Sequence, residues 1–142
     1  MGRAHAEGLN YYDTLIAVAG DCPVTASVVP PSRAKKTVAE LQYEMLVDSP
    51  FVHTQEDVLF ETWLRRQGDE IGAGDVARLR AEFLSKPQAC LRASPLPKRY
   101  GWGLLFDDGG RVALCPMESE RYRDLVASGE VTVLEALRST RR

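Results

Sequence analysis

Apolar residues occur on both faces of the first predicted element, residues 11–19 with the sequence YYDTLIAVA. Tyr12, Ile16 and Val18 alternate with Leu15 and the two alanines that follow it. Strands that are covered on both faces have this pattern. We therefore expect an interior strand near the N-terminus.

Three helices are predicted next, because apolar residues recur every three or four positions. The first covers residues 37–47, with Thr37 and Glu40 placed as a capping box, and the second covers residues 54–67. The third begins near Asp75 and runs to about residue 84. The proline at position 50 and the glycine at position 68 are typical helix-ending signals.

Alternation returns in the second half of the chain. Residues 99–106, RYGWGLLF, predict a strand, DDGG predicts a hairpin turn, and residues 111–115 predict the returning strand. A short helix is expected between Ser119 and Gly129, followed by a last strand over residues 131–137. Gly101 and Gly103 share one face of the first of these strands, so a close approach to that backbone is expected.

The predicted order is β-α-α-α-β-β-α-β. It indicates an α+β fold with a mainly antiparallel sheet of about four strands and about four helices packed on it. We expect a flexible tail over residues 1–9, one domain over residues 10–138 and a charged tail over residues 139–142. Two long connections remain: residues 20–36, called loop one, and residues 85–98, called loop two.

Composition narrows the function classes. The chain has 142 residues and a net charge of −2, which makes nucleic-acid binding an unfavoured hypothesis. No apolar run is long enough to cross a membrane, so no membrane partner and a cytoplasmic location are expected. Three widely spaced cysteines and two histidines do not form a metal motif, and loop one lacks the glycines of a phosphate-binding loop. We therefore expect no metal and no cofactor.

Positive charge is concentrated in the second half of the chain. Residues 1–85 hold 8 basic and 13 acidic side chains, whereas residues 86–142 hold 10 basic and 7 acidic ones. No acid occurs between Glu82 and Asp107. Such a basic surface can face an anion, or it can pair with the acidic half of the same domain.

The leading functional hypothesis is a binding module for a small anionic molecule, a phosphate or a carboxylate. Loops one and two would meet at one end of the sheet and present a hydroxyl, several cations and an aromatic ring. The candidate ligand-binding residues are Arg92, Ser94, Lys98, Arg99, Arg33, Lys36 and Trp102. The alternative is structural: Trp102 belongs to the core and the cations pair with acids.

Two further hypotheses stay open. A cysteine-dependent enzyme, for acyl or thiol transfer, would use Cys22 or Cys90, with His53 as the base that Cys22 needs. Cys115 ends a strand and is expected in the core. A structural or partner-binding protein would most simply be a homodimer that forms through an exposed strand edge or helix face.

The segments YYDTLIAVAGDCP, KKTVAELQYEML, DVLF and CLRASPLPKRYGWG together resemble a family of small, uncharacterised bacterial proteins, a domain of unknown function. The resemblance runs from about Asn10 to Arg138. It implies a stand-alone, single-domain cytosolic protein, and it brings no catalytic residue to carry over.

Overall fold

The computed structural model describes residues 10–67 and 71–139. The element order is β1 (Thr14–Ala17), α1 (Val38–Val47), β2 (His53–Thr54), α2 (Gln55–Arg65), α3 (Val76–Leu84), α4 (Pro95–Arg99), β3 (Trp102–Phe106), β4 (Arg111–Pro116), α5 (Glu120–Ser128) and β5 (Thr132–Glu135). Single 3-10 turns precede α3 and α4. The predicted tail at residues 1–9 lies outside the described residues, as do residues 140–142 of the predicted tail at residues 139–142.

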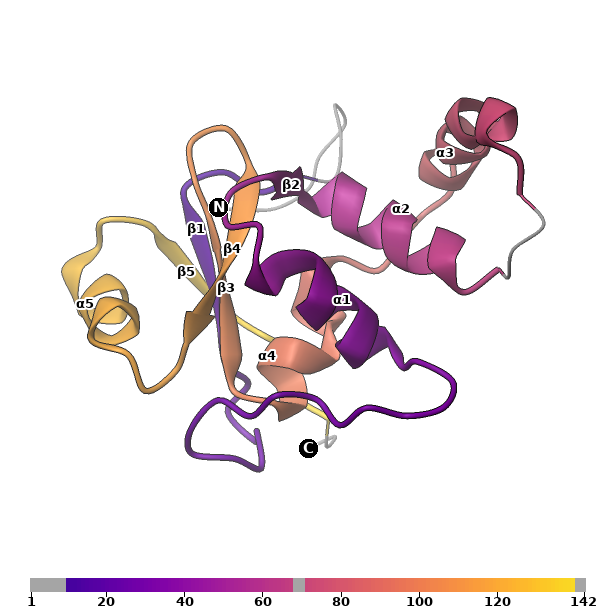
Figure 1. The fold of residues 1–142 in the computed structure, drawn as a ribbon. Helices are drawn as coiled ribbons and strands as arrows, with labels where there is room; N and C mark the ends of the chain where they lie inside the picture. The colour runs from indigo at the N-terminus through magenta and orange to yellow at the C-terminus, as the bar shows by residue number, and fades with distance from the viewer. Residues whose placement is uncertain (1–9, 68–70, 140–142) are drawn as a thin grey trace.

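One sheet of five strands, in the order β2-β4-β3-β1-β5, forms the centre of the fold. The β1–β5 pair is parallel, and the other three pairs are antiparallel. Helices α1, α2 and α4 lie on one side of this sheet and α5 lies on the other (Figure 1). The α+β class is therefore confirmed, with helices on both faces.

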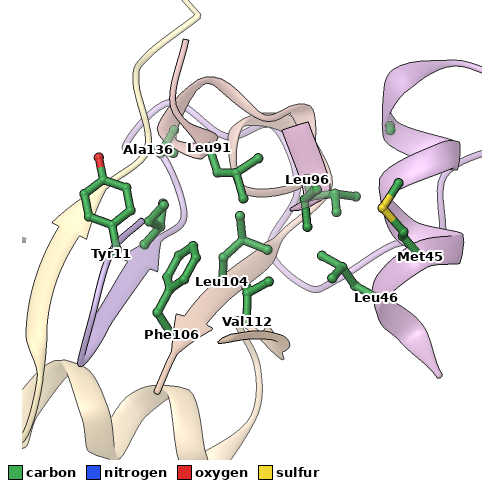
Figure 2. Close-up of a cluster of buried hydrophobic side chains, with 13 residues drawn as sticks. Tyr11, Met45, Leu46, Leu91, Leu96, Leu104, Phe106, Val112 and Ala136 are labelled. Atoms are coloured by element: carbon green, nitrogen blue, oxygen red, sulfur yellow. The ribbon is translucent and has the colours of Figure 1, made fainter. Parts of the chain in front are cut away.

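Each face of the sheet has its own core. The larger core lies under α1, α2 and α4 and includes Ile16, Leu104, Phe106 and Val112 (Figure 2). The smaller core lies under α5 and consists of Leu15, Leu105, Cys115 and Leu125. Leu15 and Ile16 point to opposite faces and are both fully buried, which confirms that β1 is an interior strand.

Several predicted details are wrong. The sheet has five strands instead of four, because His53–Thr54 forms a short edge strand directly before α2. The strand expected from residue 99 begins at Trp102, because Ser94 caps a short helix with Pro95 in its first turn. The sheet is mixed because β5 returns parallel to β1, which alternation alone does not reveal.

The predicted N-terminal caps are present, but the capping box expected from Thr37 and Glu40 is incomplete, because the Glu40 carboxylate accepts a hydrogen bond from the backbone N–H of Arg33. The Thr37 hydroxyl accepts a hydrogen bond from the backbone N–H of Glu40, and Thr54 and Asp57 form a reciprocal capping box. Ser119 caps α5, and Gly129 ends it in the left-handed conformation.

The expected close approaches at Gly101 and Gly103 are also found. A Cβ atom on Gly101 would lie 2.9 Å from the carbonyl oxygen of Ala26, and one on Gly103 would lie 2.8 Å from the ring of Tyr122.

Candidate functional site

Loop one packs against α4 and the residues that follow it. Ala19 N–H donates to Pro97 O at 3.0 Å, and Val28 N–H donates to Tyr100 O at 2.9 Å. The indole N–H of Trp102 donates to Val28 O at 2.8 Å. Loop one and the end of loop two therefore lie near each other, at the end of the sheet where β1 ends and β3 begins.

The predicted ligand-binding residues divide into two groups. Four have partners inside the protein. Arg92 Nε donates to Glu135 O at 2.7 Å, and Lys36 Nζ lies 2.9 Å from the Glu44 carboxylate. The Trp102 indole donates to Val28 O, and the Ser94 hydroxyl donates to Gln42 Oε1 at 2.6 Å. The side chains of Arg33, Lys98 and Arg99 form no hydrogen bond or ion pair with any described residue. Ser94 is also buried, and its hydroxyl oxygen accepts a hydrogen bond from the backbone N–H of Leu96 at the start of α4. The four engaged side chains therefore bind different parts of the protein and do not converge on one site.

A different set of cations shares one cavity. Lys35 and Lys36 at the end of loop one face Arg65 and Arg66 at the end of α2, and together with Ala34 and Leu41 they line a cavity of about 320 Å³. We call it the basic pocket. Lys36 pairs with Glu44 at 2.9 Å, and Arg65 lies 3.7 Å from Glu61.

The other two cations of the basic pocket have no such partner. The side chains of Lys35 and Arg66 make no ion pair with the described residues. The four cations and the two neighbouring acids therefore leave an excess of positive charge around the cavity.

A second cavity, of about 270 Å³, lies between α1, α2, α3 and residues 88–95. We call it the helix pocket. Leu59, Trp63 and Phe83 contribute apolar walls, Gln42, Thr62 and Ser94 are its buried polar lining residues, and Arg66 lines it as well as the basic pocket. A mainly apolar cavity with a few converging polar groups is the usual form of a small-molecule site.

The buried polar residues of the helix pocket form a chain. Gln42 Oε1 accepts a hydrogen bond from the Ser94 hydroxyl at 2.6 Å, and Gln42 Nε2 donates one to Thr62 Oγ1 at 3.4 Å. The Thr62 hydroxyl donates to Val58 O at 2.6 Å. A side-chain amide has two donor hydrogens and two acceptor lone pairs. One donor and one acceptor of Gln42 thus remain without a partner among the described residues, although this side chain is only 4% exposed.

Aromatic rings fix α3 against α2. Phe83 lies 5.5 Å from Trp63 and 5.8 Å from Phe60, measured between ring centroids. Arg80 stacks over Phe60 and pairs with Asp57 at 2.9 Å. Burial raises the pKa of Asp57, but hydrogen bonds from the Thr54 N–H and from Arg80 outweigh it, and the pKa lies below its usual value.

The cysteines occupy three environments, and Cys115 is buried in the smaller core, as expected. Cys90 lines the helix pocket and contacts the hydroxyl of Tyr11, whose pKa is raised above its usual range by burial and then by this contact. Cys22 follows the end of β1, whereas His53 lies level with Thr14 at its beginning, through the register Thr14–Phe106–Val112–His53. The structure therefore does not bring Cys22 and His53 together.

Sequence reasoning missed Gln42, Thr62, Arg65 and Arg66 as site residues. Gln42 was detectable in principle, because it is a polar residue four positions after Val38 and beside the apolar stripe of α1. The arginines carried no comparable signal, because cations near a helix C-terminus usually only complement the helix dipole. Among the described residues, no group of His, Cys, Asp and Glu side chains is arranged to hold a metal, and no helix could span a membrane.

A family model matches residues 6–142, and its description is a family of unknown function. The searches of curated proteins and of solved structures find no match.

Proposed function

The chain belongs to this family of unknown function, DUF6157, and we propose that it is a binding module for a small anionic molecule, held at the basic pocket. The observation that carries the proposal is the convergence of four cations on one cavity, two of them without an acid partner among the described residues. A phosphate or carboxylate group in the pocket would offset this charge.

The position of the lysines strengthens the proposal. Arg65 and Arg66 lie at the C-terminal end of α2, where cations stabilise a helix without any ligand. Lys35 and Lys36 precede the N-terminal end of α1, where the helix dipole disfavours positive charge. Lys36 is partly accounted for by its ion pair with Glu44, but helix stability does not account for Lys35, whereas an anion near the start of α1 does.

Loop one keeps the role that its sequence indicates, but its partner changes. The end of α2 replaces loop two, because Arg92 and Ser94 are engaged elsewhere. Lys98 and Arg99 on α4 remain the competing cations, and they can be tested separately.

Calorimetric titration with ribose 5-phosphate tests the proposal. We expect the double variant Lys35→Ala/Arg66→Ala to bind at least tenfold more weakly than the wild type, and we expect binding to weaken as salt is raised. The control Arg111→Ala/Arg121→Ala removes the same charge from the exposed β3–β4 hairpin and α5. The proposal is wrong if no binding is measured, or if the control loses as much affinity. If only Lys98→Ala/Arg99→Ala abolishes binding, the site lies at α4 instead.

A further inference from the structure

The basic pocket and the helix pocket meet at one side chain. Arg66 lines both, and on α1 consecutive residues divide between them, with Leu41 in the basic pocket and Gln42 in the helix pocket. A molecule whose anionic group is held by Arg66 can therefore extend its uncharged part along α1 into the helix pocket.

The unpaired donor and acceptor of Gln42 indicate which chemical group the uncharged part of the ligand carries. A buried amide with one donor and one acceptor to spare matches a ring edge that presents an acceptor beside a donor, and glutamine pairs with nucleobase edges in this way. An alkyl chain in the same place would shield these groups from water without replacing the lost hydrogen bonds. The lining thus favours a heterocycle over a fatty acyl chain.

The apolar walls offer aromatic surface to the flat faces of such a ring. Trp63 and Phe83 lie 5.5 Å apart in a tilted arrangement, and both line the helix pocket beside Leu59. Aromatic side chains stack on nucleobases with little dependence on base identity. The packing of Phe60, Trp63 and Phe83 together holds this wall in place before a ligand enters.

We infer that the ligand is a nucleoside monophosphate or a close analogue, with its phosphate at the basic pocket and its base between Gln42 and the Trp63–Phe83 wall. This inference rests on the proposed function for the phosphate and adds the identity of the group that the phosphate carries. A triphosphate is disfavoured, because the described residues contain no glycine-rich phosphate loop beside the two pockets.

Tryptophan fluorescence gives a direct test, because the chain has two tryptophans and Trp63 alone lines the helix pocket. In a Trp102→Phe protein, AMP, GMP, CMP, UMP and ribose 5-phosphate are titrated separately. We expect at least one nucleotide to quench Trp63 and to bind at least tenfold more tightly than ribose 5-phosphate. In the same background, Gln42→Met removes this advantage and leaves ribose 5-phosphate binding unchanged.

The other outcomes separate the two proposals. If ribose 5-phosphate binds and no nucleotide binds better, the inference is overturned while the proposed function stands. If neither sugar phosphate nor nucleotide binds, both fail. If Gln42→Met does not fold, Phe83→Leu carries the test, since it reduces the ring wall and leaves the buried polar chain intact, with Phe51→Leu on the other face of the sheet as its control. An unchanged nucleotide preference in Phe83→Leu contradicts the inference.

Discussion

Gly103 in β3 lies where the ring of Tyr122 from α5 packs against the face of the sheet. The Tyr122 hydroxyl also accepts a hydrogen bond from Val18 N–H at 2.8 Å, so the ring is held from both ends and cannot easily give way. The alternating glycines at positions 101 and 103 signalled a close approach to this backbone, but the identity of the approaching ring came from α5, which is distant in sequence.

Replacing Gly103 with alanine should therefore destabilise the fold. The new Cβ would lie 2.8 Å from Tyr122 and 3.0 Å from Cys115 O, and we expect a loss of about 1–3 kcal/mol in the free energy of unfolding. Gly74→Ala is the control, because nothing lies within 4 Å of its Cβ position. Urea denaturation of both variants decides: equal midpoints would mean that Tyr122 moves freely.

The thiol of Cys115 should be the least reactive of the three. Its side chain is buried in the smaller core, and burial raises its pKa, so less thiolate is present at neutral pH. We expect iodoacetamide to modify Cys115 last, as followed by mass spectrometry of the native protein at pH 7.5. Fast labelling of Cys22 or Cys90 alone would support the hypothesis of a cysteine-dependent enzyme, whereas early labelling of Cys115 would show that the α5 layer opens readily.

At the scale of elements, the sequence predicted what depends on neighbouring residues. The Thr37 and Thr54 caps, the hairpin between β3 and β4, and the Ser119 start of α5 each depend on a few consecutive positions. The two-residue strand β2 and the five-residue helix α4 were missed, because elements this short carry almost no periodic signal. The basic pocket was not predicted for a related reason: Lys35 and Arg66 come together only through the packing of α1 on α2.

The start of α2 gives a pH-dependent prediction. The pKa of Asp57 is lower in the folded protein than its ordinary value of 3.8, so its ionised form stabilises the fold above about pH 4. This contribution is lost as the pH falls through the lower folded value. We expect the wild type to lose more stability than Asp57→Asn between pH 5 and pH 3, measured by urea denaturation. Asp124→Asn, at an exposed position of α5, should lose as much as the wild type, and equal losses for all three proteins would contradict the role of Asp57.

At the scale of the whole molecule, the homodimer hypothesis stays a prediction, and the two sheet edges limit how it can form. At the β5 edge, the Arg92 side chain donates a hydrogen bond to Glu135 O, and the Arg92 carbonyl oxygen accepts one from Leu137 N–H. Part of the backbone at this edge is therefore already hydrogen-bonded. Near the β2 edge, Phe51 is 39% and Val52 is 54% exposed. Contact through this apolar surface is therefore the better route.

Light scattering at micromolar concentration tests this version of the dimer. We expect a dimeric mass for the wild type and a monomeric mass for Val52→Lys, because a lysine would place charge in an apolar contact. Thr132→Lys, on the exposed side of β5, should leave the mass unchanged. A monomeric wild type removes the hypothesis, and a monomeric Thr132→Lys would move the contact to β5.

The central place of β1 has a consequence for protein synthesis. Its two neighbours, β3 and β5, are translated long after it, whereas α1 and α2 can form their own hydrogen bonds as soon as they leave the ribosome. A nascent chain that has not reached Trp102 carries Leu15 and Ile16 on a strand with both backbone edges open. Until Thr132–Glu135 emerges, one of those edges remains open to other nascent chains and is a natural point for a chaperone to protect.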